Sequence, residues 1–160
     1  MRLPKQSVLK LLKIYKTNNP FTIASRKGIT VLYEQLGDIL GYYSTYKRMK
    51  FIHLNRDNGE SEQRFVIAHE LGHVVLHPNL NTPFLRKNTL LSVDRIEREA
   101  NEFAVELLIS DKLLLEGVSI YDAAAACGVP EEVAHLKSKP DGMKKSVQRF
   151  LTKEDSYFSL

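Results

Sequence analysis

The sequence predicts an α+β protein in which a small, mostly antiparallel sheet packs on helices. Residues 29–55 are rich in β-branched and aromatic side chains separated by turn residues, which favours a few neighbouring strands. The segments on both sides repeat apolar residues at helical spacing. With 160 residues, 43% hydrophobic and 26% charged, the chain has the composition of an ordinary soluble globular protein. We therefore expect a single domain over residues 1–160.

The first third of the chain predicts two helices followed by three strands. Ser7 is placed to cap a helix over residues 8–17, and the Asn-Asn-Pro sequence at 18–20 ends it. A second short helix is expected over residues 21–25. Strands are expected at residues 29–36 and, as a pair, within 41–55. In the last strand Ile52 and Leu54 alternate with Phe51 and His53, which indicates one buried and one exposed face.

The remainder predicts helices joined by turns. Ser61 is expected to cap a long helix that ends at His77, before Pro78, and residues 78–91 read as a loop. Asp94 opens the next long helix. Asp111 and Ser119 are expected to cap two shorter helices. A Gly-Val-Pro turn at 128–130 leads into EEVAHLK, and residues 138–160 are expected to form a helix and a loose end.

Cysteine usage and apolar runs exclude several classes of protein. Cys127 is the only cysteine, which rules out an intramolecular disulfide framework and a cysteine-based zinc knuckle, and it suits a reducing cytoplasm. The longest apolar runs are far shorter than the ~20 residues of a membrane span. The first twenty residues have no continuous apolar core and no small-residue cleavage site, so they read as an amphipathic helix and not as a signal peptide.

Charge is unevenly distributed along the chain. Residues 1–60 carry 11 Lys and Arg against 4 Asp and Glu, whereas the whole chain has a net charge of +4. This basic third, with the helix–Gly-Val-Pro–helix at 119–137, raises the alternative of a DNA-binding protein. We favour a solvated lysine-rich helix face and expect no direct nucleic-acid partner, because no arginine-rich arm or glycine-rich phosphate loop accompanies it.

The stretch FVIAHELGHVVLH at residues 65–77 carries three of the five histidines. His69 and His73 are four positions apart on a predicted helix, so their side chains lie on one face and can hold one ion. Imidazole suits Zn²⁺, and a catalytic zinc has three protein ligands and one open position. Glu70 lies at the rim of the same face, where it can accept a proton from an attacking water and pass it to a leaving amine. This pattern is H-E-x-x-H.

A third ligand is required, and the next long helix is the best source. The candidates are His53, His77, His135, Asp94, Glu97, Glu99 and Glu102. His77 lies two turns from His69, ~12 Å along the axis, so one ion cannot contact both. Glu97 and Asn101 share a helix face, so Glu97 can ligate while Asn101 accepts the spare N–H of a ligating histidine. Glu99 points away from that face and is expected to be solvated.

Two motifs together resemble those of the ImmA/IrrE family of metallopeptidases. The family pattern HELGH-x-x-LH falls on residues 69–77, and E-x-x-A-[ND/S]-x-FA-x-x-L falls on 97–107. PFTIA, GYYSTYKRMKFIHLN and SIYDAAAACGVPEEVAHLK also resemble family segments, so the resemblance covers about residues 20–137. Asn101 stands where related metallopeptidases often have Asp, and it brings no charge to support the histidine.

The resemblance implies a zincin-like fold, with His69, His73 and Glu97 as zinc ligands and Glu70 as the catalytic carboxylate. It implies a cytoplasmic zinc endopeptidase that cuts a helix-turn-helix repressor of a phage, a mobile element or a stress response, and so acts as an anti-repressor. Mn²⁺ or another divalent ion is the alternative to zinc. A non-hydrolytic metal-binding regulator, acting by protein–protein binding, is the alternative to an enzyme.

Peptide hydrolysis also needs a second electrophile for the oxyanion. Tyr42, Tyr43, Tyr46 and Arg48 lie just upstream of the motif and remain open candidates. If the strand at 49–54 is a sheet edge beside the metal helix, an extended substrate could add to it as a further strand.

Overall fold

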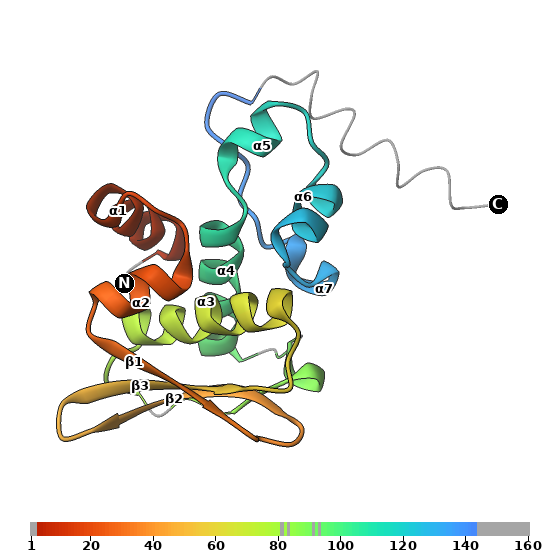
Figure 1. Ribbon diagram of the computed structural model, residues 1–160. Coiled ribbons are helices and arrows are strands. Elements are labelled where there is room, and N and C mark those ends of the chain that lie inside the picture. The colour runs from red at the N-terminus through yellow and green to blue at the C-terminus, as the bar shows by residue number, and fades with distance from the viewer. Residues whose placement is uncertain (1–2, 81, 83, 91, 93, 144–160) are drawn as a thin grey trace.

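The computed structural model describes residues 3–80, 82, 84–90, 92 and 94–143. The elements in chain order are α1 (Pro4–Tyr15), α2 (Pro20–Arg26), β1 (Ile29–Glu34), β2 (Ile39–Tyr46), β3 (Met49–Asn55), α3 (Glu60–Leu76), β4 (Leu85–Arg86), η1 (Lys87–Thr89), α4 (Arg95–Leu108), α5 (Asp111–Leu115), α6 (Ile120–Cys127) and α7 (Glu131–Ala134). The helices lie on one side of the sheet, and α3 runs across its face (Figure 1). The α+β class is therefore confirmed.

The sheet is mixed, so the prediction of a mostly antiparallel sheet was wrong. Its strand order is β1-β3-β2-β4, with β1 parallel to β3 and with β2 antiparallel to β3 and β4. β2 and β3 form a hairpin whose two turn residues, Lys47 and Arg48, both have positive φ. β1 does not pair with its chain neighbour β2, because the chain crosses the end of β3 before β2 begins.

Asn55 holds this crossing in place. Its side chain is 2% exposed and donates to the carbonyl oxygens of Gly37 and Ile39, each at 3.0 Å. One buried amide thus satisfies two backbone groups, one in the linker that carries the chain past β3 and one in the first residue of β2. A hydrophobic pattern reports which face of a strand is buried, but not which strand is its neighbour, so the sequence could not reveal this order.

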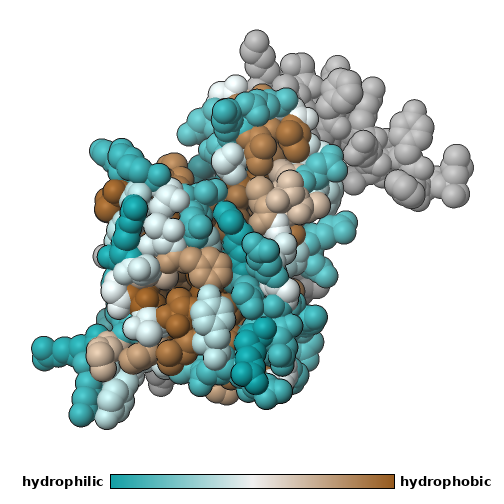
Figure 2. All heavy atoms as spheres, viewed as in Figure 1, coloured by the Kyte–Doolittle hydropathy of each residue, from teal (hydrophilic) through white to brown (hydrophobic). Residues whose placement is uncertain are grey.

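The helical layer packs on one face of the sheet. Ile52 and Leu54 of β3 are fully buried there, while Phe51 and His53 remain partly exposed on the other face, as predicted. Gly41 of β2 allows α3 to come close, since a Cβ at this position would lie 2.6 Å from Cγ1 of Val66. In the view of Figure 2, apolar residues gather over α3 and between α3 and the sheet, with hydrophilic residues around them.

Several helix starts differ from those predicted. α1 begins at Pro4, and Ser7 is buried inside it, because proline is preorganised for the first helical position. Gly59 replaces Ser61 as the N-cap of α3, and Ser110 replaces Asp111 as the N-cap of α5. The predicted caps Asp94 and Ser119 are confirmed, since each side chain accepts a backbone N–H of its helix.

Two further expectations concern the segments outside the long helices. The predicted loop at residues 78–91 contains the strand β4 and the 3-10 turn η1, since Leu85 is fully buried at the sheet edge. The expected C-terminal helix and loose end fall largely on residues 144–160, outside the described residues. Across the described ranges, none of the helices is both long enough and apolar enough to cross a bilayer.

A buried ion network attaches α5–α7 to the rest of the fold. Lys137 follows α7, and its ammonium lies 2.7 Å from Glu106 of α4 and 2.6 Å from Asp111 of α5. The Lys137 and Glu106 side chains are 2% and 1% exposed. Burial raises the pKa of Asp111, but hydrogen bonds and charge from Lys137 and Lys5 outweigh it and hold that pKa below its usual value.

We predict that Lys137→Met lowers the free energy of unfolding by about 3–5 kcal/mol, because it leaves the buried Glu106 carboxylate without a counter-charge. Urea unfolding followed by circular dichroism measures this as a lower midpoint at an unchanged slope. The exposed Lys139→Met is the matched control and should change stability by less than about 0.5 kcal/mol. Equal midpoints for the two variants would contradict the role given to the network.

Candidate metal centre

Helices α3 and α4 bring His69, His73 and Glu97 into one cluster. Nε2 of His69 lies 3.3 Å from Oε2 of Glu97, and Nε2 of His73 lies 3.1 Å from Oε1 of the same carboxylate. The two Nε2 atoms are 3.0 Å apart, and the three ligand atoms all lie within 4.8 Å of one another. A tetrahedral ion with bonds near 2.0–2.1 Å separates its ligand atoms by about 3.3 Å, so the donor set fits a divalent metal ion.

The cluster depends on a close crossing of α3 and α4. Gly72 lies between the two histidines on the chain, and a Cβ there would meet Cα and O of Ala100 and Cβ of Phe103, each at 3.2 Å. The absence of a side chain at Gly72 therefore allows the two helices to approach closely. Asp94 caps α4 by accepting the N–H of Ile96 at 2.8 Å, which places Glu97 in the first turn, beside α3.

Asn101 fixes the orientation of the His69 ring. His69 Nδ1 donates to Oδ1 of Asn101 at 2.8 Å, as predicted, so Nε2 is left to face the cluster. The amide nitrogen of Asn101 donates to the carbonyl oxygen of Leu90, also at 2.8 Å. A carboxylate could accept from His69 but could not donate to Leu90. The asparagine thus makes two bonds where an aspartate would make one.

Glu70 is fully buried beside the cluster, and neither of its carboxylate oxygens has a hydrogen-bond partner among the described residues. Burial, with a smaller contribution from the Glu97 charge, raises its pKa to about 7, although His69 opposes this shift. Burial also acts on Glu97, but hydrogen bonds and charge from the two histidines lower its pKa to about 2. The carboxyl group of Glu70, whose pKa is raised, therefore lies near the carboxylate of Glu97, whose pKa is lowered.

The other histidines lie outside the cluster. His77 pairs with Glu99, with Nε2 and Oε2 3.2 Å apart, and Arg95 donates to the other Glu99 oxygen at 2.6 Å. Glu99 was predicted to be solvated, but its side chain is only 17% exposed. His53 contacts Glu34 and Ser44 on the sheet, and His135 is exposed at the end of α7.

Two of the four candidates for a second electrophile, Tyr42 and Tyr43, have partners on the sheet. Tyr42 stacks on His53 with ring centroids 4.2 Å apart, on the sheet face that α3 does not cover. Tyr46 and Arg48 lie at the β2–β3 turn, and Tyr43 accepts from Thr45. Within the described part of the chain, no hydrogen bond or ion pair joins any of these four residues to the cluster. The condition for strand addition to β3 is not met, because β3 lies between β1 and β2 and is not an edge of the sheet.

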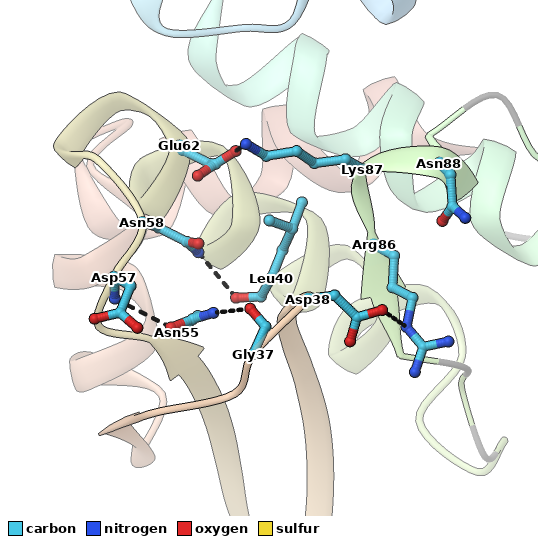
Figure 3. A pocket seen from close by; sticks show the side chains of 10 residues that line it. All are labelled: Gly37, Asp38, Leu40, Asn55, Asp57, Asn58, Glu62, Arg86, Lys87 and Asn88. Atoms are coloured by element: carbon cyan, nitrogen blue, oxygen red, sulfur yellow. Dashed lines mark hydrogen bonds and ion pairs between the residues drawn. The ribbon is translucent and has the colours of Figure 1, made fainter.

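A polar hollow of about 400 Å³ opens at the ends of the strands (Figure 3). Four of its charged residues form two ion pairs, with Lys87 3.5 Å from Glu62 and Arg86 3.6 Å from Asp38. Its lining includes no residue of the metal cluster. The sequence did not indicate this hollow, nor that the Leu90 carbonyl accepts a hydrogen bond from Asn101, because the residues involved come from separate elements.

Comparison with known proteins identifies the family. Residues 24–139 match the family model Peptidase_M78, described as an IrrE N-terminal-like domain. The chain belongs to this family. The expected ImmA/IrrE resemblance is thereby confirmed, and the chain is a member of a metallopeptidase family.

Two curated relatives of this peptidase family span most of the chain. An uncharacterized immunity region protein 2 of Bacillus phage phi105 is 46% identical over 138 residues, which is 83% of this chain and 87% of the phage protein. The metallopeptidase ImmA of Bacillus subtilis strain 168 is 35% identical over 141 residues, which is 83% of this chain and 82% of that protein.

We predict that Gly72→Ala weakens metal binding by about tenfold or more, because the added Cβ forces α4, and Glu97 with it, away from α3. Helix propensity alone would favour alanine by about 1 kcal/mol, so a loss of stability reports the helix contact. Competition with a chromophoric chelator measures the affinity. Gly59→Ala is the control, since a Cβ there meets nothing within 4 Å. Equal metal affinities for the two variants would rule out the proposed constraint.

A second prediction follows from the two bonds of Asn101. Asn101→Asp should loosen the segment at Leu85–Leu90, because the Leu90 carbonyl loses its donor and faces a carboxylate oxygen instead. Limited proteolysis of the metal-free protein should then cut this segment about tenfold faster than in wild type. Asn101→Ala is the comparison, since it removes the donor without adding charge. A segment equally protected in all three proteins would argue against the link.

Proposed function

We propose that this protein is a zinc-dependent endopeptidase that cleaves a helix-turn-helix transcriptional repressor and so relieves repression. His69, His73 and Glu97 are the proposed metal ligands, and Glu70 is the proposed catalytic carboxylate. The proposal treats residues 1–160 as one zincin-like metallopeptidase domain that acts in the cytoplasm, where such a repressor works.

The burial of Glu70 carries the proposal. A purely structural site with these three ligands needs no second carboxyl group, and burying one without a hydrogen-bond partner costs stability. Glu70 follows the proposed ligand His69 directly in the chain, so its carboxylate lies where it can accept a proton from the attacking water. A catalytic role therefore accounts for a residue that the fold alone does not require.

The proposed mechanism divides the work between metal and protein. A bound Zn²⁺ supplies Lewis acidity, which polarises the scissile carbonyl and makes an attacking water more acidic. Glu70 takes the proton of that water through a carboxylate oxygen and later gives it to the leaving amine. Its pKa of about 7 suits both transfers. Asn101 keeps the His69 proton on Nδ1, so that Nε2 stays available.

Zinc is the proposed metal because two imidazoles and one carboxylate are a common donor set for catalytic zinc. Burial lowers the pKa of His73, which favours the neutral imidazole that binds metal. Mn²⁺ or another divalent ion is the alternative, since availability as well as geometry decides occupancy.

The proposed substrate rests on the nature of the relatives. One is named for a phage immunity region, and another is named metallopeptidase ImmA. An immunity region controls whether a phage stays repressed, so a protease in this setting has a repressor as its natural target. We therefore propose a protein partner and expect no direct contact with nucleic acid.

The burial of the whole centre favours a second candidate. His69, Glu70 and His73 are fully buried, and Glu97 is 3% exposed, so a peptide cannot reach them without a movement of the fold. A regulator that binds metal and acts through protein–protein contacts, without hydrolysis, would not need such access.

We predict that the zinc-loaded protein cuts the helix-turn-helix repressor encoded beside its gene at a defined bond. Glu70→Gln should bind zinc as well as wild type but cleave at least about 10³-fold more slowly, because it cannot carry the proton. Mass spectrometry of the fragments identifies the bond, and an EDTA-treated sample is the control. An intact repressor, with repression still relieved by Glu70→Gln in cells, would support the regulator instead.

A further inference from the structure

An apolar hollow of about 240 Å³ lies beside α3, between this helix and the turn that joins α6 to α7. Its walls come from four parts of the chain. They are contributed mainly by Leu40, Phe65, Leu90, Ala125, Val129 and Pro130. Gly128 closes the turn onto α3, since a Cβ there would lie 3.0 Å from Cβ of Ser61. The hollow is thus a built feature of the fold, and the metal centre does not use it.

This hollow is one helical turn from the candidate metal centre. Phe65 precedes His69 by four residues on α3, and their ring centroids are 6.3 Å apart. One such step is ~6 Å along the helix axis, which is about two residues of an extended peptide. Leu90 is connected to the centre as well, through the bonds from its carbonyl to Asn101 and from Asn101 to His69.

The hollow is also the middle of a longer groove. It shares Leu40 and Glu62 with the charged hollow of Figure 3. It shares Leu90 with a third hollow of about 340 Å³, whose walls include Arg98 and His135. The three hollows therefore adjoin through shared lining residues, with charged residues at both ends and apolar residues in the middle, and two of them are lined by residues of α3, the helix that carries His69.

We propose that the apolar hollow binds an aliphatic side chain of the substrate, such as leucine, isoleucine or methionine, within about two residues of the bond that is cut. This inference rests on the proposed peptidase function and adds a substrate preference to it. An aliphatic side chain gains from leaving water, whereas a charged one would lose hydration, and the one charged residue of the lining, Glu62, is already paired with Lys87. An acidic side chain would in addition meet Glu62 at the rim.

Ala125 and Ala126 provide a matched pair of variants. Both are exposed on α6, but only Ala125 lines the hollow. Ala125→Phe should fill part of the hollow without disturbing the core, and Ala126→Phe adds the same ring outside it. Equal stability of the two variants in urea shows that both fold.

The probe is N-acetyl-L-leucinamide, with N-acetylglycinamide as the blank. Methyl NMR of Leu90 and Val129 follows binding to the full chain, both metal-free and as zinc-loaded Glu70→Gln. We expect saturable shifts with the leucine probe alone. Ala125→Phe should weaken binding at least about tenfold, and Ala126→Phe should change it less than about twofold.

Absence of saturable shifts, or equal effects of the two phenylalanines, would overturn the proposed subsite. The readout needs neither hydrolysis nor the repressor, so it separates this inference from the proposed function. Leucine binding without repressor cleavage would leave a peptide-binding groove in a non-hydrolytic regulator. Cleavage without leucine binding would leave a peptidase that selects its substrate elsewhere.

Discussion

The close crossing of α3 and α4 is the constraint on which the candidate centre depends. Two ligands on one helix leave the third to be supplied from outside, and its position then depends on how closely the second helix approaches. Gly72 sets this distance against Ala100, and Gly41 sets the approach of the sheet to the same helix at Val66. α3 is thus held between two glycine contacts, one on each side, and this packing sets the positions of the proposed metal ligands.

The buried polar residues divide into two groups that differ in how they are satisfied. Outside the centre, Asn55 and Glu106 are fully engaged, by two backbone carbonyls and by Lys137 with the N–H of Ser138. Inside it, Glu70 has no partner among the described residues. Burying this carboxyl group without a partner has a local cost in stability, and such costs concentrate at functional sites.

Features that depend on local sequence could be predicted, and those set by distant contacts could not. The long helices, the caps at Asp94 and Ser119, and the pairing of His69 with Asn101 all follow from spacing along one or two helices. The mixed sheet could not be predicted, because a buried amide at the end of β3 decides where β2 begins. The groove was equally hidden, since its walls come from elements scattered along the chain.

Leu90 connects the groove to the candidate metal centre. Its side chain lines two adjoining hollows of the groove, and its carbonyl is held by the same asparagine that orients His69. A peptide that displaces Leu90 would therefore strain the bond that keeps His69 in the tautomer suited to metal binding. An aspartate at position 101 would support the imidazole with a full charge, but it would give up this link. Compared with an aspartate, Asn101 gives His69 less electrostatic support, but through Leu90 it links the groove to the candidate centre.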